Sequence, residues 1–402
     1  MNVLYLTYDG LLDPLGDSQI LPYIEGVQSE AKNFYIISFE KKTKSAQDIK
    51  AKQVYLSERN LTWIHLSFSK SSNVLFKIFD MLKLYLIIFR ILLFKNIDLI
   101  HARGHPSASS ALFFKNLFSF SLLFDFRGLW ADEKVTKGGW NLSRKSHFLQ
   151  YKYFKNREMK LFKNSEKIVV LTKKVASEIE GLCPDISNKI TIIPCAADFK
   201  HFSPTTNKTS YEKDTDFSVN RIVFGYLGSI GPMYQFKRYL RLIDLARKKG
   251  LDANGLIVTG NQDLAELHIK NFFQGQMPKF LRVVSANRSE IPKLINKMSC
   301  LISFYSIKYS VISVSPTKIG ETLACGVPII CNSGIGDTNE IVSSLNAGLV
   351  IKDTSDQSLN KAISKINKIL KLNPTFIRNN SREIFDLDVA VAKYKKIYQS
   401  IE

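Results

Sequence analysis

Short apolar runs alternate with longer amphipathic segments along almost the whole chain. Unbroken apolar runs bounded by turn residues are typical of parallel strands that helices cover on both faces. The runs lie at 3–7, 34–39, 62–66, 98–101, 122–126, 167–171 and 191–194, and then at 221–227, 255–259, 280–285, 301–304, 327–331 and 348–351. Two such sets predict an α/β fold of two Rossmann-like domains that face each other across a cleft, with ligands at the carboxyl ends of the strands.

The two sets of strands are separated by a polar, charged stretch that ends near residue 220. Its composition is typical of a linker. The chain has 402 residues, which is enough for two cores. We therefore predict a first domain over 1–200, a second domain over 205–385, and a C-terminal helix over 386–402 that could cross back to the first domain.

One segment, 315–331, combines a helix start, a helix end and a buried strand. Ser315 is placed to cap the helix, and Pro316 suits the first helical position. Gly326 is placed to end the helix, and Pro328 cannot continue it. The segment therefore predicts a helix that begins at the ligand-binding edge of the second sheet.

The start of this helix has the features of an anion site. Free N–H groups and the positive end of the helix dipole lie at Ser315 to Lys318, and Lys318 adds a full charge. Glu321 follows one turn later, where a carboxylate can accept hydrogen bonds from a sugar diol. A phosphate site beside a diol acceptor suggests a nucleotide or a nucleotide sugar as the ligand.

The chain is strongly basic, with 56 Lys and Arg against 36 Asp and Glu and a net charge of +20. Such an excess favours a polyanionic neighbour: nucleic acid, an anionic membrane face or phosphorylated substrates. No nucleic-acid-binding signature is present, so nucleic acid is not an expected partner. The five cysteines are scattered and mostly apolar in context, which indicates buried thiols in a reducing compartment.

Two segments raise the question of a membrane. The charged residues of 73–96 fall within one arc of a helical wheel, and no uncharged run of about 18 residues exists, so a spanning helix is not expected. A core helix of the α/β layer is the favoured interpretation, and a helix lying partly in a membrane interface is the alternative. The second segment, 140–163, mixes aromatic and basic residues, which fits either an anionic surface or a solvated amphipathic helix.

The chain resembles a glycosyltransferase of the GT-B type, family 4 (glycosyl transferases group 1), from bacterial surface-polysaccharide pathways. The resemblance extends nearly end to end and rests on the segments 8–19, 124–133, 169–172, 193–194, 225–229 and 315–326. It implies transfer of a hexose or related sugar from a nucleotide-sugar donor to a hydroxyl of a lipid-linked glycan, such as lipopolysaccharide or capsule. It also implies retention of the anomeric configuration, no metal and no cofactor.

By this resemblance Glu321 is the second glutamate of the family's Glu-x7-Glu element and binds the donor's ribose. The position of the first glutamate, which contacts the transferred sugar, is Ser313 here. The donor sugar is therefore left open. The loop through Ser313, Ser315 and Thr317 could still offer amides and hydroxyls to the donor.

Four further positions are assigned to the donor. Gly228 would let the backbone approach the diphosphate, and Ser229 could donate to it. The resemblance places Gly16, in the first βα loop, near both donor phosphate and acceptor. Ser285 lies in the segment that resembles the base-binding strand, where recognition is by backbone groups.

The first domain supplies the acceptor and catalytic candidates. Asp125 and Arg127 share one face at a strand end, where Arg127 could stabilise the departing phosphate and Asp125 could accept a proton or orient Arg127. A structural ion pair is an equal alternative. The residues that could contact the acceptor are Asp13, Gln19, His101 and Arg103, although a core histidine is at least as good an interpretation of His101.

The predicted protein is a cytoplasmic glycosyltransferase, peripherally associated with the inner face of the plasma membrane. Its catalytic groups would be Asp125, Arg127 and Lys318. Two alternatives remain open at this point: a nucleotide-sugar epimerase of the same architecture, which needs no acceptor, and a non-catalytic polyanion-binding protein.

Overall fold

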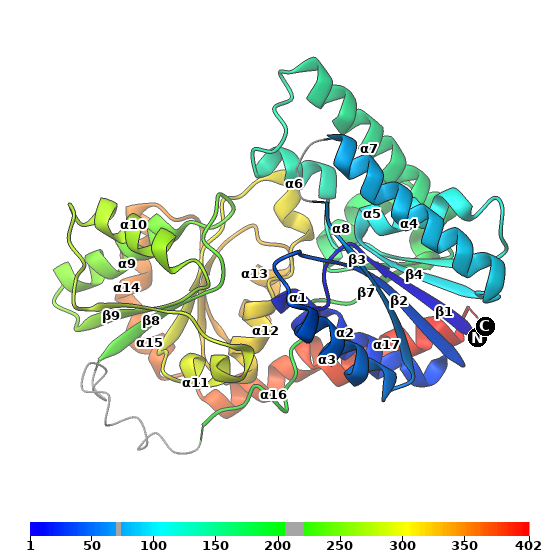
Figure 1. Cartoon of the computed structure of the whole chain (residues 1–402). Coiled ribbons are helices and arrows are strands. Elements are labelled where there is room, and N and C mark those ends of the chain that lie inside the picture. The colour runs from blue at the N-terminus through cyan, green and yellow to red at the C-terminus, as the bar shows by residue number, and fades with distance from the viewer. Residues whose placement is uncertain (70–73, 206–220, 402) are drawn as a thin grey trace. The chain divides into compact units, whose positions relative to one another are not determined.

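The computed structural model describes residues 1–69, 74–205 and 221–401. The chain divides into two compact units, each built around one parallel sheet (Figure 1). The first unit comprises Met1–Pro194 and Ala390–Glu402, and the second comprises Cys195–Val389. The predicted linker lies mostly in 206–220, outside the described residues.

The first unit contains a seven-stranded sheet in the order β3-β2-β1-β4-β5-β6-β7. Its strands are β1 (Asn2–Thr7), β2 (Asn33–Glu40), β3 (Leu61–Ser67), β4 (Leu99–Arg103), β5 (Ser121–Asp125), β6 (Lys167–Val170) and β7 (Ile190–Ile192). Leu4 pairs with Tyr35 on one side and with Ile100 on the other, so β1 is central. Its apolar run is buried on both faces, as the absence of polar alternation predicts.

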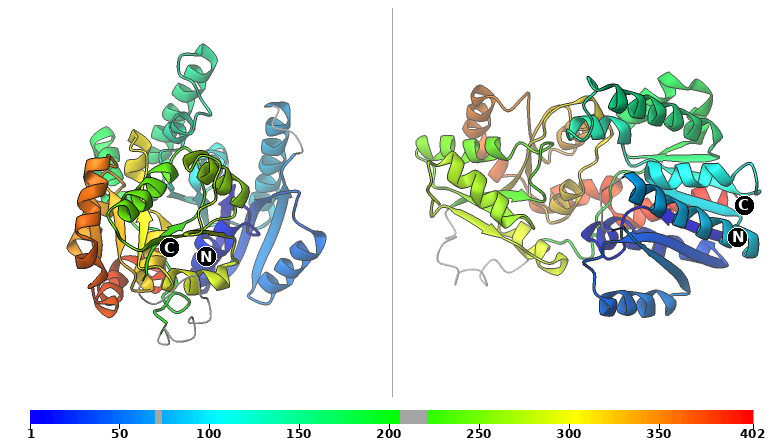
Figure 2. Two further views of the ribbon diagram at one scale, coloured as in Figure 1. Left: turned by 90° about the vertical axis from the view of Figure 1, so that its left-hand side faces the viewer. Right: turned by 45° about the horizontal axis from the view of Figure 1, so that its top comes forward.

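Helices cover both faces of this sheet. One face carries α1 (Pro14–Gln19), α2 (Leu21–Val27), α3 (Ala46–Ser57) and part of α17 (Leu387–Gln399) (Figure 1). The opposite side carries α4 (Val74–Phe94), α5 (Gly104–Phe114), α6 (Trp130–Thr136), α7 (Lys145–Asn164) and α8 (Lys173–Leu182) (Figures 1 and 2). In the described part of the chain, no helix combines the length and hydropathy needed to cross a bilayer.

The C-terminal helix α17 joins the first unit from Ala390 onward. A side chain at Gly26 would collide with Val391, so the glycine allows close packing of α2 against α17. Tyr394 contacts Tyr23 edge-on, with ring centroids 5.5 Å apart. The hydroxyl of Tyr398 lies 2.8 Å from Nδ1 of His101, so the end of the helix packs against β4.

The second unit contains a six-stranded sheet in the order β10-β9-β8-β11-β12-β13. Its strands are β8 (Ile222–Leu227), β9 (Ala253–Val258), β10 (Leu281–Val284), β11 (Cys300–Ser303), β12 (Ile329–Asn332) and β13 (Gly348–Ile351). Its helices are α9 (Phe236–Lys248), α10 (Gln262–Phe272), α11 (Ile291–Asn296), α12 (Thr317–Ala324), α13 (Thr338–Ser344), α14 (Asp356–Ser364), α15 (Ile366–Leu370) and α16 (Pro374–Phe385).

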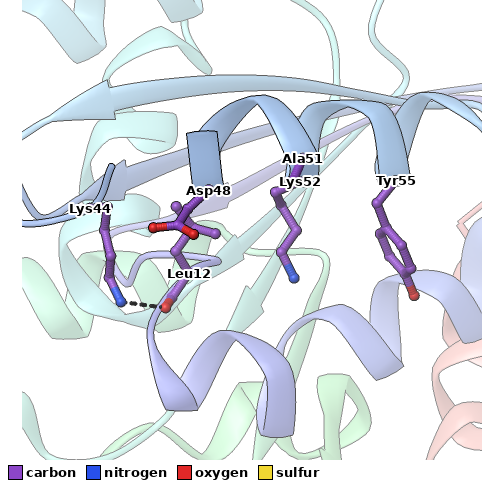
Figure 3. Close-up of a pocket in the computed structure, with 6 residues that line it drawn as sticks. All are labelled: Leu12, Lys44, Asp48, Ala51, Lys52 and Tyr55. Carbon is purple, nitrogen blue, oxygen red and sulfur yellow. Dashed lines mark hydrogen bonds between the residues drawn. The ribbon is translucent and has the colours of Figure 1, made fainter. Parts of the chain in front are cut away.

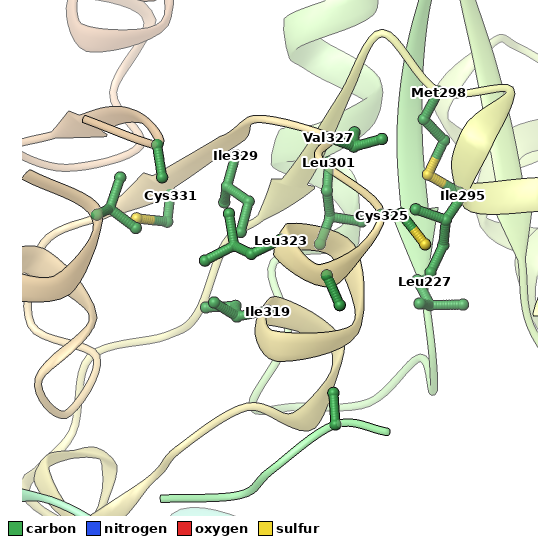
Figure 4. Packing of buried hydrophobic residues seen from close by; sticks show 14 of the residues in the cluster. Leu227, Ile295, Met298, Leu301, Ile319, Leu323, Cys325, Val327, Ile329 and Cys331 are labelled. Atoms are coloured by element: carbon green, nitrogen blue, oxygen red, sulfur yellow. The ribbon is translucent and has the colours of Figure 1, made fainter. Parts of the chain in front are cut away.

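The core of the second unit fixes α12 on its sheet. Ile319 and Leu323 project from α12 toward Leu301 of β11 and Ile329 of β12 (Figure 4). These side chains are almost fully buried, and full burial of each contributes roughly 1.5–3 kcal/mol. The start of α12 is therefore held firmly at the edge where β8 and β11 end.

The α/β fold with two Rossmann-like parallel sheets, predicted from the apolar runs, is confirmed. Every predicted run lies on a strand, and the ends differ by only a few residues. All five cysteines are free and buried.

Candidate functional site

The helix α12 begins at Thr317, one residue later than the predicted start. Pro316 has φ −70° and ψ 116°, which is extended backbone, so it precedes the helix instead of occupying its first turn. The prediction of Ser315 as the cap was wrong, because its hydroxyl accepts the backbone N–H of Cys195 at 3.2 Å. The N–H of Ile319 already donates to the Pro316 carbonyl at 3.0 Å, and with no side-chain cap the N–H groups of Thr317 and Lys318 are the ones that an anion could bind.

The predicted helix end at Gly326 is confirmed. Gly326 has φ +71° directly after the C-cap, a conformation that favours glycine. A Cβ at this position would lie 2.6 Å from the carbonyl oxygen of Pro374. The tight turn sends the chain straight into β12 and so fixes the length of α12.

Lys318 lies among three tyrosine rings. Its Nζ is 5.3 Å from the ring centroid of Tyr226, 4.8 Å from that of Tyr234 and 5.4 Å from that of Tyr305. Burial among these rings lowers the pKa of Lys318 to about 8. The rings attract the ammonium group through cation–π contacts, which hold the amine in place.

Gly228 and Ser229 directly follow strand β8, at the carboxyl end of the second sheet. Gly228 has φ +111°, and no other described atom lies within 4 Å of where its Cβ would project. The backbone carbonyl of Ser229 accepts a hydrogen bond from the Tyr226 hydroxyl at 2.7 Å. Ser229 itself is exposed. β8 and β11 are neighbours in the sheet, and the strands that follow β8 lie on one side of this pair while those that follow β11 lie on the other. Ligands of such sheets usually bind beside this switch point, at the carboxyl ends of the strands.

Glu321 is buried and forms an ion pair that the sequence did not predict. Its Oε1 accepts a hydrogen bond from Arg288 Nη1 at 3.0 Å. Burial raises the pKa of Glu321, and the charge and hydrogen bond of Arg288 oppose that rise. Arg288 follows β10 in a single 3₁₀ turn, Arg288–Glu290.

Ser313 and Ser285, two other donor candidates, differ in exposure. Ser313 ends the 3₁₀ turn Tyr309–Ser313, is almost fully buried, and donates its hydroxyl to the carbonyl of Ser310 at 2.8 Å. Ser285 is exposed directly after β10. The hydroxyl at the position of the missing glutamate therefore supports its own turn.

In the first unit, Asp125 is the centre of a buried charged cluster. Its carboxylate lies 3.5 Å from Arg103 Nη1, 3.4 Å from Arg127 Nη1 and 3.7 Å from His101 Nε2. Although burial alone would raise it, Arg127, His101 and Arg103 hold the pKa of Asp125 well below its usual range. A carboxylate so stabilised is a weak base, so the geometry favours its orienting role toward Arg127.

The assignment of His101 to the acceptor does not fit its position. His101 is 2 % exposed and lies between Tyr5 and Tyr394, with ring centroids 4.5 Å and 5.5 Å away. Burial lowers its pKa, so the ring is a neutral core histidine. Arg103 is also buried, and it spans Asp125 and Asp9.

The first βα loop is shorter than predicted. Pro14 begins α1, so Gly16 lies inside this helix and not in a loop. A Cβ at Gly16 would collide with the Leu11 carbonyl. Gln19, at the end of α1, is 1 % exposed and donates to the Ser18 carbonyl at 2.9 Å, which removes it from acceptor contact. Asp13 is half-buried and pairs with Lys41 at 2.9 Å.

Sequence reasoning missed Glu40, which organises this loop. The buried carboxylate at the end of β2 accepts the N–H of Leu11 at 2.7 Å and the N–H of Leu12 at 3.2 Å. The hydroxyl of Ser38 adds a third hydrogen bond at 2.7 Å. An acidic residue directly after a buried strand was the available signal.

A pocket of about 490 Å³ opens beside this loop in the first unit (Figure 3). It lies between Leu12 and helix α3, and Lys44 Nζ donates to the Leu12 carbonyl at 2.6 Å on its wall. Its lining residues are Leu12, Lys44, Asp48, Ala51, Lys52 and Tyr55. Charged and hydroxyl groups around one aromatic ring could bind a polar, hydroxyl-rich molecule.

Residues 207–383 match the family model described as glycosyl transferases group 1. This segment contains the α12 start, Lys318, Glu321 and Arg288. A search of curated proteins by sequence found no significant match.

Solved structures of similar fold cover the whole chain. Sucrose-phosphate synthase from Thermosynechococcus elongatus has a TM-score of 0.70 at 13 % identity, with 100 % of this chain and 98 % of that chain covered. HepE from Anabaena, in complex with UDP and glucose, has a TM-score of 0.68 at 13 % identity, with 100 % of both chains covered. WaaG, a glycosyltransferase involved in lipopolysaccharide biosynthesis, has a TM-score of 0.68 at 12 % identity, with 98 % of this chain and 99 % of that chain covered.

At these identities the structural matches establish the fold, which is the α/β fold of GT-B glycosyltransferases. The family match is separate evidence and concerns residues 207–383, a little under half of the chain.

Proposed function

We propose that this protein is a group 1 glycosyltransferase, which moves a sugar from a nucleotide-sugar donor to a hydroxyl of a lipid-linked glycan, with retention of the anomeric configuration and without a metal. The observation that carries the donor assignment is the α12 site within the matched segment. An uncapped helix start, a tyrosine-held lysine and a buried glutamate lie on consecutive turns of one helix. That order suits the diphosphate and the ribose of one nucleotide.

The chemistry of the donor site follows from its charges. As the glycosidic bond breaks, negative charge grows on the leaving diphosphate. The N–H groups of α12, the Lys318 ammonium and the open backbone at Gly228 are the groups of the second unit that would stabilise it. Glu321 would hold the ribose hydroxyls and so fix the nucleotide while the bond breaks.

The donor and acceptor classes are proposed from the similar structures. The HepE complex contains UDP and glucose, so UDP-hexoses are the first donors to test. WaaG acts in lipopolysaccharide biosynthesis, which favours a lipid-linked surface glycan as the acceptor. In the first unit, Arg127 and the surface around Asp13 and the Figure 3 pocket are the proposed acceptor-facing groups.

Product analysis tests this proposal. The protein is incubated with UDP-, GDP- and ADP-sugars and lipid-linked glycan acceptors, and products are followed by mass spectrometry. We expect a new glycoside and one equivalent of nucleoside diphosphate, and Glu321→Ala should reduce both. An epimerised donor formed without acceptor would instead identify an isomerase, and donor consumption with an inverted linkage by NMR would refute retention.

We further propose that the first unit attaches to the cytoplasmic face of the plasma membrane. Helix α4 exposes a row of large apolar side chains, and the end of α5 extends it through ring contacts of Tyr85 with Phe113 and of Phe89 with Phe118. We call these exposed residues the α4–α5 apolar surface: Phe76, Ile78, Phe79, Leu82, Leu86, Phe89, Leu93, Phe94, Phe113 and Leu117.

The α4–α5 apolar surface is larger than a core helix requires. The opposite face of α4 packs inward through Leu84, Ile88 and Leu92, so this helix has one apolar face in the core and another in solvent. Contiguous exposed apolar patches of this kind mark interaction sites. Lys77, Lys83 and Arg90 lie on the same helix, which favours an anionic lipid surface as the partner. Asn73, where the predicted segment began, lies outside the described residues.

The basic and aromatic stretch 140–163 contributes less to such a surface than its composition suggests. Lys155 pairs with Asp132 at 3.0 Å and with Glu158 at 2.5 Å. Trp140 and Phe154 stack on each other with centroids 5.6 Å apart. The large apolar or aromatic side chains of this stretch that are exposed are Leu142, Phe148, Leu149 and Tyr153, and its exposed basic residues are Arg144, Lys145, Lys152, Lys160 and Lys163.

A further inference from the structure

The ion pair between Arg288 and Glu321 has a consequence for nucleotide binding. Glu321 is only 8 % exposed, so an ionised carboxylate there has lost most of its water. Burying an unpaired charge is costly, and an isolated buried acid tends to take up a proton instead. A protonated glutamate would accept fewer hydrogen bonds from a ribose.

We propose that Arg288 is a positioning residue of the donor site, which holds Glu321 ionised and oriented so that it accepts the two ribose hydroxyls of a nucleotide. This inference rests on the proposed function, because it assumes that Glu321 binds the donor. Arg288 would act through Glu321 and need not touch the substrate.

The geometry restrains Arg288 before any ligand arrives. Asn287 and Glu290 form a reciprocal capping box around the 3₁₀ turn that carries it. Nε2 of His201 lies 3.1 Å from the Arg288 carbonyl oxygen and donates to it. The guanidinium lies 5.3 Å from the ring centroid of Phe202, which covers it with an apolar surface.

The hydrogen bond from Arg288 uses only part of the carboxylate. An ionised glutamate has about four acceptor positions on its two oxygens. Arg288 occupies one of those on Oε1 at 3.0 Å. The remaining positions suffice for two hydroxyl donors, which is the number that an intact ribose offers.

The other charged groups near Glu321 cannot replace Arg288. His201 contributes a weaker attraction, and the Cys325 thiol is buried. Arg378, from α16, donates to the carbonyls of Ala324, Phe199 and Phe202, which direct its guanidinium to the backbone. Lys318, on α12 itself, is held over the ring of Tyr234 and its neighbouring tyrosines.

The first test is the pH dependence of nucleotide affinity. Calorimetry measures the Kd of UDP, and of ADP and GDP for comparison, from pH 5.5 to 8.5. The proteins are wild type, Arg288→Ala, Arg288→Lys and Lys293→Ala, which removes an exposed cation from the following helix. Comparing each variant with wild type at the same pH cancels the protonation of the phosphate itself.

We expect the ratio of the Arg288→Ala Kd to the wild-type Kd to increase as the pH falls, by up to about tenfold per pH unit while the freed Glu321 takes up its proton, and to be larger at the acidic end of the series than at the alkaline end. Arg288→Lys should restore most of the wild-type profile, and Lys293→Ala should match wild type throughout. The ratio should shrink for the 2′-deoxy nucleotide, which has lost one hydroxyl. A ratio independent of pH, or equal for the ribose and deoxyribose ligands, would overturn the assignment.

A second test needs no ligand. Burial puts the folded pKa of Glu321 above its ordinary value of 4.5, so ionising it costs stability as the pH rises above 4.5. Without Arg288 this cost grows, so the Tm deficit of Arg288→Ala should increase from pH 5 to pH 8. A constant deficit would refute the role of Arg288. Failure of the wild type to bind any nucleoside diphosphate would instead refute the donor site.

Discussion

Replacing three side chains of the α4–α5 apolar surface should abolish salt-resistant membrane binding. Phe79, Leu82 and Leu86 lie on one face of α4 and are 54 %, 55 % and 68 % exposed. Glutamine at all three positions keeps a good helix former and removes the apolar surface. Because the side chains are mostly in solvent already, each change should alter the free energy of unfolding by less than about 0.5 kcal/mol.

The expected loss follows from the exposed fractions. Full burial of a Leu or Phe contributes about 1.5–3 kcal/mol, so the exposed parts of the three side chains together would contribute about 3–5 kcal/mol on insertion. That is at least about a hundredfold in the partition constant. Each nearby Lys or Arg adds about 1 kcal/mol toward an anionic surface, and salt screens this contribution.

Co-sedimentation with vesicles separates the two contributions. Wild type should bind anionic vesicles, bind neutral vesicles poorly, and retain part of its binding at high salt. The triple glutamine variant should lose the salt-resistant part. A matched control is Leu264→Gln with Leu267→Gln in α10, which removes side chains 37 % and 53 % exposed in the second unit. Equal loss in this control, or no wild-type binding at low salt, would refute the membrane surface.

Charge reversal on α7 tests the electrostatic contribution to membrane binding, and the ion pairs of the structure show which lysines are suitable. Lys152 and Lys160 are exposed on α7, so glutamate there should lower anionic vesicle binding without changing UDP affinity. Lys155 is unsuitable, because its reversal would leave Asp132 and Glu158 facing a third negative charge. Unchanged vesicle binding at low salt would show that α7 does not face the lipid.

Three further changes test the donor site and its support. Glu321→Ala should weaken UDP binding by about 1.5–3 kcal/mol, and an unchanged Kd in calorimetry would exclude Glu321 from the ribose site. Because the pKa of Lys318 is about 8, its charge is lost as the pH rises through that value, so UDP affinity should fall from pH 7 to pH 9 in wild type. Lys318→Ala should remove this dependence and weaken UDP more than UMP, whereas a parallel fall in the variant would point to another group. Gly326→Ala should cost about 1–3 kcal/mol of stability in thermal unfolding, because it forces a side chain into φ +71°, while Gly231→Ala, where the space is open, should cost less.

The elements of the fold could be predicted because each depends on neighbouring residues. The run at 327–331 is apolar over its whole length, and only a strand covered on both faces accommodates that pattern. The helix end at Gly326 could also be predicted, because glycine readily adopts the positive φ that such an end requires. The wide apolar face of 73–96 was visible too, but the sequence could not show that half of it would lie in solvent.

The pairings within the site could not be predicted, because they join residues that are distant in sequence. The hydroxyl of Ser315 looked like a helix cap until the fold brought the N–H of Cys195, 120 positions away, within reach. His101 became a core residue through Tyr398, 297 positions away. The ionisation of Glu321 likewise depends on a residue that is distant in sequence. Its position in α12 followed from local pattern, whereas its ionisation depends on Arg288, 33 positions earlier on another element. A residue type and a spacing can therefore nominate the acid of a sugar site, but the fold decides whether that acid is charged.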